Sequence, residues 1–222
     1  MAIPIVLSWS GGKDSTLALH YLKQQQAFEV VYLLTTITET YQRISMHGVR
    51  LELLEQQAAA LKIPLLIVPI PPNCTNEIYE DRMLNTLKQL KDKGIHTFAF
   101  GDIFLSDVRQ YRENQLDRLN LKAIFPLWGI DSAYLARQFI NLGFKAILSC
   151  VDTQQINASF AGHEFNLQLL NSLPTSADPC GENGEFHTFV FDGPLFHFPL
   201  KINKAEKVMR DNRFCYCELT PT

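Results

Sequence analysis

The feature that most constrains this chain of 222 residues is the sequence SGGKDS at residues 10–15. It follows the apolar run IPIVL at residues 3–7 and precedes a helical pattern that contains Leu17 and Leu22. The two glycines therefore lie where a strand turns into a helix. Backbone amides and the positive end of a helix dipole hold phosphate at such turns. The pattern predicts a phosphate-binding loop made of Ser10, Gly11, Gly12, Lys13, Asp14 and Ser15.

The residue types of this loop suit a ligand with several negative charges. Gly11 and Gly12 let the backbone approach without a Cβ atom, and Lys13 adds a compact cation. Asp14 is the exception, because a carboxylate repels phosphate; it would serve either as a partner for Mg²⁺ or as a cap that orients the loop amides. The spacing is not that of a Walker A loop. The competing interpretation is a generic tight turn with a capped helix.

Composition favours an ordinary globular protein, with 46% hydrophobic and 19% charged residues. The net charge of −3 gives no general attraction to nucleic acid or to anionic membranes. We find no apolar run of about 18–20 residues and no room for a signal peptide before the first strand, so we expect a cytoplasmic protein that does not enter membranes. The sequence does not determine the oligomeric state, and a homodimer is one possibility. The five cysteines contain no C-x-x-C pair, which argues against a structural zinc site or a redox dithiol: Cys74, Cys150, Cys180, Cys215 and Cys217.

Strand-like and helical patterns alternate along most of the chain. We expect strands near residues 3–7, 29–34, 64–70, 96–100, 123–128 and 144–151, with helices between them. This alternation predicts an α/β fold with a doubly wound, mostly parallel, Rossmann-like sheet. We expect residues 1–151 to form the nucleotide-binding core. Residues 152–222 would form a smaller, substrate-facing region with some antiparallel structure, packed as part of the same unit.

An acidic turn lies at residues 178–188, with the sequence DPCGENGEFHT. Glu182 and Glu185 stand three residues apart with Asn-Gly between them, and Asp178 lies just upstream. The functional interpretation is a carboxylate pair that binds a cation or ammonia, or orients a carbonyl substrate. The alternative is a solvated acidic turn before a strand.

Two further segments could contribute to a site. Gly101 and Asp102 end an expected strand, and Arg109, Arg112 and Glu113 follow on a helix. In a functional interpretation, Asp102 lies near phosphate and metal, and the arginines bind an anion. In the alternative, the segment is an exposed helix with salt bridges. The second segment, at residues 45–50, contains His47 and Gly48 and follows the second strand, where an adenine pocket would lie. A lone histidine is more often structural.

Four motifs together resemble the diphthine–ammonia ligase family of ATP pyrophosphatases, which has an adenine nucleotide alpha-hydrolase-like fold. They are SGGKDS at 10–15, GDIFLSDVRQYRE at 101–113, PLWGIDS at 126–132 and DPCGENGEFHTFVFDGPLF at 178–196. The family's usual pattern is Glu-Gly-Gly-Glu followed by an aromatic residue, Glu and Thr. Asn183 and His187 depart from it. Asp102 also departs, because archaeal and eukaryotic members tend to have a small residue there, and the chain resembles the bacterial branch.

The resemblance implies an ATP- and Mg²⁺-dependent ligase. A carboxylate on a protein or small molecule would attack the α-phosphorus of ATP, release pyrophosphate, and then be transferred from AMP to ammonia. Lys13, Asp102, Glu182 and Glu185 would be the catalytic residues, with Asp14 and Asp102 near the metal. The loop at 10–15, His47, Gly48 and Gly101 would bind the nucleotide. Six residues would bind the acceptor: Arg109, Arg112, Glu113, Cys180, Gly181 and Gly184.

Three alternatives remain beside this prediction. One is a tRNA-modifying ATP pyrophosphatase, for which the net charge of −3 is unfavourable. Cys215 and Cys217 could suggest thiol chemistry, but buried structural cysteines explain them as well. The second is a nucleotide sensor without chemistry, and the third is an amide ligase for a small metabolite.

Overall fold

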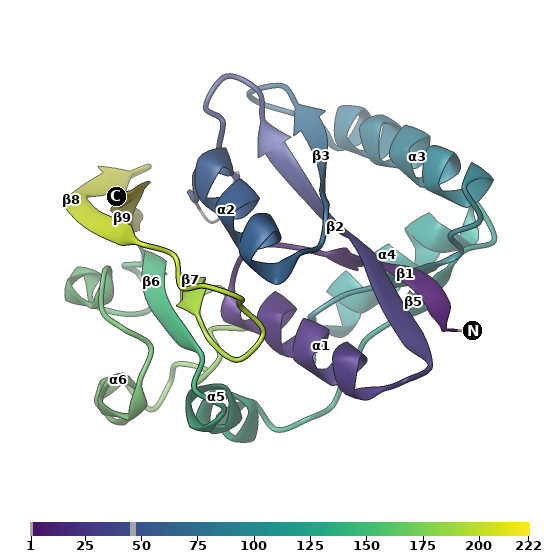
Figure 1. Ribbon diagram of the computed structural model, residues 1–222. Helices are drawn as coiled ribbons and strands as arrows, with labels where there is room; N and C mark the ends of the chain where they lie inside the picture. The colour runs from purple at the N-terminus through teal and green to yellow at the C-terminus, as the bar shows by residue number, and fades with distance from the viewer. Residues whose placement is uncertain (1, 45–47) are drawn as a thin grey trace.

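A computed structural model describes residues 2–44 and 48–222. Its N-terminal half is built on a five-stranded parallel sheet (Figure 1). In order across the sheet, the strands are β3 (Leu65–Ile70), β2 (Phe28–Thr38), β1 (Ile3–Ser8), β4 (Thr97–Ala99) and β5 (Lys122–Ile124). The order reverses beside β1, and ligands of such sheets bind at this point, outside the carboxyl ends of the strands.

Helices cover both faces of this sheet. They are α1 (Lys13–Gln24), α2 (Leu51–Leu61), α3 (Asn76–Asp92) and α4 (Ser106–Asp117). Along β1, Ile5 and Leu7 belong to one hydrophobic cluster with Leu17 of α1, whereas Val6 belongs to a second cluster with Leu87 of α3. Successive side chains of a strand point to opposite faces, so a continuously apolar strand supplies both cores. The predicted doubly wound α/β core is confirmed.

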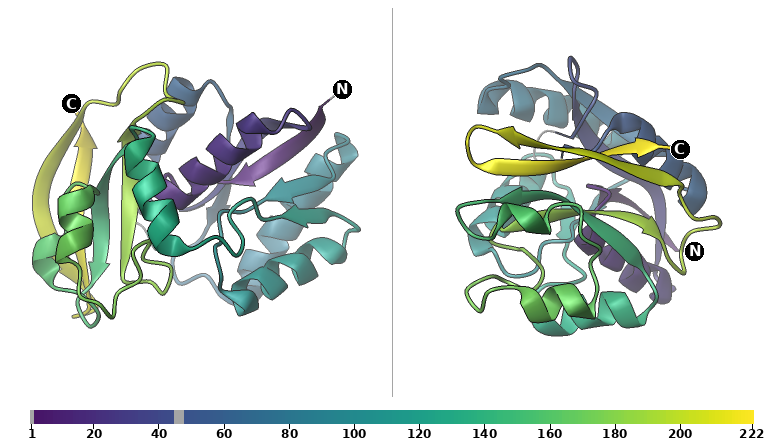
Figure 2. Two further views of the ribbon diagram at one scale, coloured as in Figure 1. Left: turned by 90° about the horizontal axis from the view of Figure 1, so that it is seen from below. Right: turned by 90° about the vertical axis from the view of Figure 1, so that its left-hand side faces the viewer.

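The C-terminal half forms a second sheet, which is antiparallel (Figure 2). Its strands, in order, are β7 (Phe186–Asp192), β6 (Lys145–Asp152), β9 (Phe214–Pro221) and β8 (Ile202–Arg210). The helical elements of this half are α5 (Ser132–Asn141), η1 (Ala158–Phe160) and α6 (Leu167–Ser172). Among the helices of residues 2–44 and 48–222, none combines the length and the apolar character needed to cross a membrane.

One strand lies in a different sheet from the one that we expected. The sequence suggested that residues 144–151 continue the parallel alternation, but β6 pairs antiparallel with β7 and β9. The reason is that a continuously buried strand has the same apolar pattern in either kind of sheet. The range 1–151, expected as the nucleotide-binding core, thus contains a strand whose partners all lie in the second sheet. The division into 1–151 and 152–222 stays a prediction.

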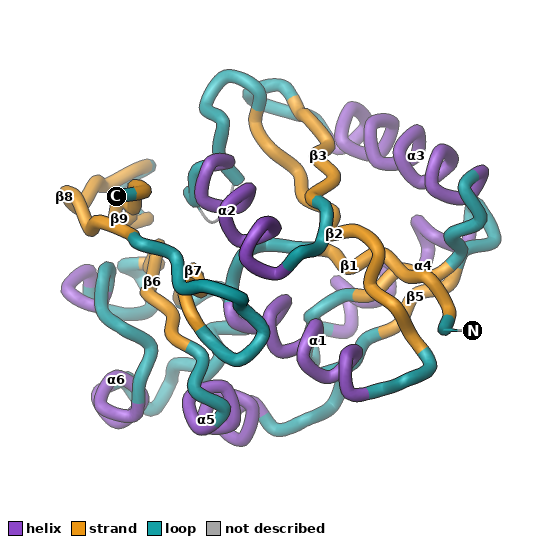
Figure 3. The backbone as a smooth tube through the Cα atoms, in the orientation of Figure 1, coloured by secondary structure: helices purple, strands orange, loops and turns teal. Residues whose placement is uncertain are grey.

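The two sheets meet at the loop that precedes α1, as the tube representation shows (Figure 3). The edge strand β7 lies against this loop, because the amide of Val190 donates to the carbonyl of Gly11 at 2.9 Å. The amide of Lys13 donates to the hydroxyl of Thr188 at 3.0 Å. The loop is therefore positioned by both halves of the chain.

Candidate functional site

The loop at residues 10–15 connects β1 to α1 as the sequence predicted. Gly12 is the N-cap of α1, and its amide donates to the hydroxyl of Ser10 at 3.3 Å. The hydroxyl of Ser15 donates to the carbonyl of Gly12 at 3.0 Å. Gly11 has a φ of +75°, and a Cβ there would lie 2.7 Å from Leu54 Cδ2. Only glycine fits this combination of a left-handed backbone and a close neighbour.

Gln57 holds the loop, although its position in the sequence did not mark it as functional. Its side chain is fully buried on α2. Its amide group donates to the carbonyls of Gly11 at 2.9 Å and Val190 at 2.6 Å, while its oxygen accepts from the Trp9 indole at 2.9 Å. The available signal was a glutamine on the apolar face of a predicted helix, because a buried amide needs hydrogen-bond partners.

Lys13 connects the loop to the acidic turn. Its side chain is only 2% exposed, and Nζ donates to both oxygens of Asp14, at 2.9 and 2.8 Å, and to the carbonyl of Cys180. Nζ also lies 5.4 Å from the ring centre of Phe186. Burial lowers the pKa of Lys13, but Asp14, Cys180 and Glu182 together outweigh burial and the net pKa is raised. The ammonium therefore stays charged, which suits a group that neutralises phosphate.

The residues that follow β4 lie against the loop. A Cβ at Gly101 would be 2.9 Å from the backbone carbon of Asp14, so glycine allows the close approach. Asp102 accepts from Arg112 Nε at 2.6 Å and from its Nη2 at 3.2 Å. The guanidinium of Arg112 lies 4.7 Å from the ring centre of Phe100. Asp102 is thus held by a forked ion pair, a geometry that fixes the orientation of the carboxylate.

Arg109 has different surroundings from Arg112. Its guanidinium carbon lies 4.9 and 4.6 Å from the ring centres of Phe125 and Trp128, and its Nε donates to Glu113 at 2.8 Å. Those two aromatic residues follow the short strand β5, in a segment that the sequence suggested was still strand. Arg109 and Glu113 do not line the large cleft described below. Their contacts are those of a packed, salt-bridged helix.

The acidic turn is built largely by its own hydrogen bonds. One oxygen of Asp178 accepts from the amides of Cys180 at 2.9 Å and Glu182 at 3.1 Å. Glu185 is 2% exposed, and its Oε1 accepts from the amide of Asp178 at 2.7 Å and from the side chain of Asn183 at 3.2 Å. Its Oε2 is buried and has no partner among the described residues. Glu185 therefore closes the turn from the inside.

Glu182, in contrast, faces the space above the loop. Its Oε1 accepts from the amide of Ile103 at 2.7 Å and more weakly from that of Phe104 at 3.4 Å. Burial raises the pKa of Glu182 to about 7, although the Ile103 amide favours the ionised form. Asp14 and Asp102 add to the increase. A carboxyl group that titrates near neutral pH suits general acid–base chemistry.

A cleft of about 1260 Å³ brings these groups together. Its walls come from the carboxyl ends of the parallel strands and from one face of the second sheet. The predicted site residues that line it are Ser10, Gly12, Lys13, Asp14, Ser15, Gly101, Asp102, Arg112, Gly181, Glu182 and Gly184. Those that do not line it are Gly11, Gly48, Arg109, Glu113, Cys180 and Glu185. His47 falls outside the described residues.

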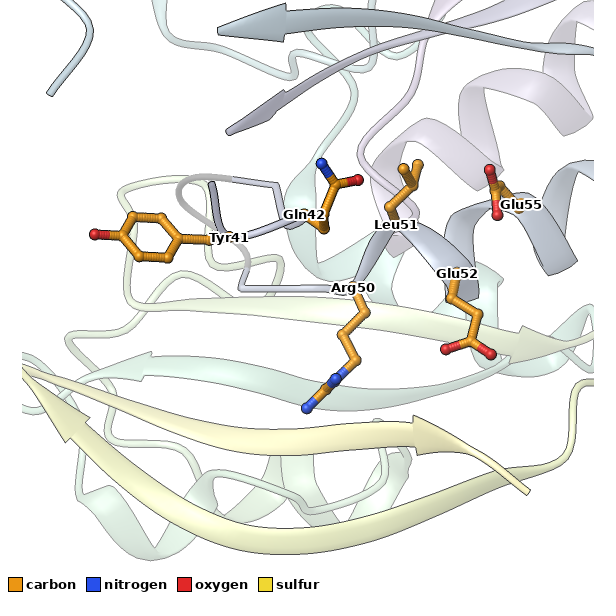
Figure 4. Close-up of a pocket in the computed structure, with 6 residues that line it drawn as sticks. All are labelled: Tyr41, Gln42, Arg50, Leu51, Glu52 and Glu55. Atoms are coloured by element: carbon orange, nitrogen blue, oxygen red, sulfur yellow. The ribbon is translucent and has the colours of Figure 1, made fainter. Parts of the chain in front are cut away.

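A smaller pocket of about 260 Å³ lies at the start of α2 (Figure 4). It is lined by Tyr41, Gln42, Arg50, Leu51, Glu52 and Glu55. Tyr41 also lines the large cleft, so the two hollows adjoin each other. Gly48 lies nearby and packs closely on Tyr216, because a Cβ there would be 2.5 Å from the tyrosine ring.

His187, Cys150 and Cys180 do not provide a charged nucleophile. Burial and the charge of Lys13 lower the pKa of His187 to about 4, so the imidazole that lines the cleft is neutral at pH 7. Burial raises the pKa of Cys150 to about 12 and that of Cys180 still further. The Cys180 thiol donates to the carbonyl of Ser132 at 3.2 Å. Thiols of this kind are structural, because nucleophilic cysteines need a lowered pKa.

No group of three or more His, Cys, Asp and Glu side chains that could hold a metal occurs within residues 2–44 and 48–222. Asp14 and Asp102, the expected magnesium ligands, have Lys13 and Arg112 as partners. Magnesium commonly binds through one or two carboxylates together with substrate phosphates. The two carboxylates fit that mode and do not fit an ion held by protein alone.

A parallel α/β sheet with a glycine loop at its topological switch point is an architecture of nucleotide-binding proteins. Comparison with known families identifies the family within this class. Residues 4–123 match the Diphthamide synthase N-terminal domain, and residues 131–220 match the Diphthamide synthase C-terminal domain. The chain belongs to the diphthamide synthase family.

Three curated relatives illustrate the similarity, and each is named diphthine–ammonia ligase. The protein of Danio rerio is 35% identical over 115 residues, which cover 49% of this chain and 45% of the relative. That of Mus musculus is 33% identical over 144 residues, covering 61% and 53%. That of Bos taurus is 28% identical over 185 residues, covering 76% and 67%. The chain spans about half the length of most curated relatives that it matches.

Proposed function

We propose that this chain is an ATP-dependent ligase that activates a carboxylate and transfers it to ammonia. The observation that carries the proposal is the position of Lys13, whose ammonium bonds both to the phosphate loop and to the acidic turn. Membership of the diphthamide synthase family and relatives named diphthine–ammonia ligase support it.

In the first step a carboxylate oxygen of the acceptor attacks the α-phosphorus of ATP. The bond to the pyrophosphate oxygen breaks, and charge builds on the leaving group. The amides of the loop and the ammonium of Lys13 stabilise this charge, because fixed donors act strongly where water is excluded. Magnesium, when bound, would neutralise phosphate charge, with Asp14 and Asp102 as its protein ligands.

In the second step ammonia attacks the activated carbonyl and AMP leaves. The attacking nitrogen must lose a proton, and Glu182 is the group that we assign to accept it. Its carboxyl lines the cleft and has a pKa of about 7. Glu185, buried behind the turn, holds the turn in place rather than taking the proton.

The acceptor is a carboxylate on a protein or small molecule, and diphthine is the one suggested by the names of the relatives. A cytoplasmic location fits five cysteines that form no disulfide. The raised pKa values of Cys150 and Cys180 are unfavourable for thiolate chemistry at these two residues. The net charge of −3 is unfavourable for a tRNA-modifying enzyme. A nucleotide sensor is the remaining rival, and it predicts no pyrophosphate with any acceptor.

The test is a screen of carboxylates, diphthine-bearing protein included, that measures pyrophosphate and AMP with ATP and ammonia present. We expect both products with at least one acceptor, and their loss in Lys13→Ala and Glu182→Gln. ATP binding by the intact protein without turnover of any carboxylate would instead support the sensor.

A further inference from the structure

Three arginines surround one carboxylate beside the cleft, at a place that the proposed chemistry does not use. Arg43 forms a forked pair with Glu218, with Nη1 at 2.9 Å from Oε1 and Nη2 at 2.6 Å from Oε2. Arg50 Nη2 lies 3.5 Å from Oε2, and Arg210 Nη2 lies 3.4 Å from Oε1. We call Arg43, Arg50, Arg210 and Glu218 the arginine cluster.

The arginine cluster has more positive charge than its carboxylate can neutralise. Arg43 uses its donors on Glu218 and on the carbonyl of Gly48. Arg50 and Arg210 reach Glu218 only with one nitrogen, and each side chain is 42% exposed. Asp211 also lines the cleft and offsets part of the remaining charge. Arg50 lines the small pocket together with Glu52 and Glu55, so its charge is offset there. Within the large cleft, two guanidinium groups, those of Arg43 and Arg210, stand beside the carboxylate of Asp211.

Unused donors accompany this charge. Nε of Arg50 is buried and has no hydrogen-bond partner among the described residues. In Figure 4 the Arg50 side chain extends from the start of α2 toward the strands of the second sheet. The guanidinium of Arg210 lies 4.9 Å from the ring centre of Tyr216, which orients its plane. Planar, oriented guanidinium groups with spare N–H donors are suited to carboxylate or phosphate.

The strand order of the second sheet allows the distance between the arginine cluster and the phosphate loop to be estimated. His187 on β7 lies opposite Cys150 on β6, and Cys150 lies opposite Tyr216 on β9. Adjacent strands are about 4.8 Å apart, so Tyr216 is about 10 Å from His187 across the sheet. β7 is the strand that bonds to the loop, and β8, which carries Arg210, is one strand beyond Tyr216. The cluster therefore lies about 10–15 Å from the loop.

We propose that the arginine cluster is an anion subsite for the acceptor. It would bind a second anionic group, a carboxylate or a phosphate, that the acceptor carries apart from the carboxylate to be activated and that lies about 10–15 Å from the phosphate loop. Arg43, Arg210, Tyr216 and His187 all line the same cleft as Lys13, so one molecule can contact both ends. The assignment to the acceptor rests on the proposed ligase function, whereas the anion subsite itself does not.

The first test measures anion binding directly by calorimetry, with the loop already occupied by a non-hydrolysable ATP analogue. Inorganic phosphate and succinate serve as probes and separate the two chemistries. We expect saturable binding of at least one probe to the intact protein, and at least ten-fold weaker binding in Arg50→Gln/Arg210→Gln. The control is Arg118→Gln/Arg137→Gln, which removes the same charge outside the cleft and should bind as the unmodified protein does.

Three results would overturn the proposal. They are the absence of saturable probe binding, equal affinity in both double variants, and weaker binding of the ATP analogue itself in Arg50→Gln/Arg210→Gln. The last result would assign the arginine cluster to the nucleotide. With an acceptor from the pyrophosphate screen, the KM for the acceptor should rise at least ten-fold in this variant while the KM for ATP is unchanged. An unchanged KM for the acceptor would refute the acceptor assignment. If no acceptor turns over, the ligase function fails and the calorimetric result stands by itself.

Discussion

The phosphate loop at residues 10–15 and the acidic turn at residues 178–185 face the same cleft but are held in different ways. The loop is fixed from outside, by Gln57 of α2, by Thr188 of β7 and by the close approach of Gly101. The turn is fixed mainly from within, by the hydrogen bonds of Asp178 and Glu185 to neighbouring amides. A change in the loop should therefore disturb the core, whereas a change in the turn should act locally.

Backbone and side-chain hydrogen bonds join the turn to the rest of the molecule, and one of them runs from the amide of Asp152 to the carbonyl of Glu185 at 2.9 Å. Lys13 bonds to the carbonyl of Cys180, Glu182 accepts from the amide of Ile103, and Ser132 donates to Asp178 at 2.5 Å. Two of these contacts use side chains to which we assign chemistry. The position of the turn relative to the loop therefore depends in part on the same groups that would carry the reaction.

The largest effect should come from Lys13→Ala. This change removes the buried cation from the phosphate loop and its bond to the turn, so we expect pyrophosphate release to fall at least 100-fold, the scale for loss of one fixed charge-stabilising group. Steady-state turnover with a responding acceptor measures it. Lys23→Ala, at the exposed end of the same helix, is the matched control and should keep full activity. If turnover in Lys13→Ala stays within a few-fold of that of the intact protein, Lys13 does not stabilise the leaving group. The ligase proposal then loses its main support.

Glu182 should make stability depend on pH. Its pKa is about 7 in the folded protein and near 4.5 when unfolded. Between pH 4.5 and 7, Glu182 is mostly protonated in the folded protein and mostly ionised in the unfolded chain. Its contribution to stability is therefore fully present below pH 4.5 and is lost as the pH rises through 7. The shift corresponds to about 3 kcal/mol at most.

Urea unfolding of the intact protein and Glu182→Gln, between pH 5 and 8, measures this dependence. The variant should lose less stability than the intact protein over this range. Glu29→Gln, an exposed change on β2, should leave the slope as it is. Parallel pH profiles for the intact protein and Glu182→Gln would show that the carboxyl is not held in a buried setting.

The loop was predictable from the sequence because all its determinants are contiguous. An apolar strand, two glycines, a lysine and a helix follow each other between residues 3 and 24. Each of these features favours the same strand–loop–helix structure. The acidic turn was predictable for the same reason, from Asn-Gly between two glutamates. Local pattern sufficed for both.

What the sequence could not predict depends on contacts between distant segments. The parallel or antiparallel pairing of β6 is decided by which strands lie beside it, and its own apolar residues fit both. Gln57 supports the loop across 46 residues, and Arg43 meets Glu218 across 175. Residue type alone did not separate Glu182, in the cleft, from Glu185, behind the turn.

A pair of glycine substitutions compares the packing of the two regions. Gly11 and Gly184 have similar left-handed φ values, +75° and +85°. Alanine at either position costs about 1 kcal/mol in backbone strain. At Gly11 the added Cβ would also lie 2.7 Å from Leu54 and 2.8 Å from Gln57, whereas nothing lies within 4 Å at Gly184.

We therefore expect Gly11→Ala to lower the free energy of unfolding by about 1–3 kcal/mol more than Gly184→Ala, the usual range for overpacking. Chemical unfolding of both variants measures the difference. Equal losses would mean that the loop is no more constrained by its neighbours than the turn is.

The smallest effect should come from Arg109, three residues from Arg112 on the same helix. Arg112 lines the cleft and orients Asp102, so Arg112→Gln should lower turnover about ten-fold. Arg109 does not line the cleft, and its contacts are with Glu113, Phe125 and Trp128. Arg109→Gln should cost about 1 kcal/mol of stability, the scale of a surface ion pair and an exposed cation–π contact, and leave turnover within two-fold. If Arg109→Gln instead raises the KM for the acceptor, the acceptor extends beyond the cleft along α4, and the predicted arginine clamp would include both residues.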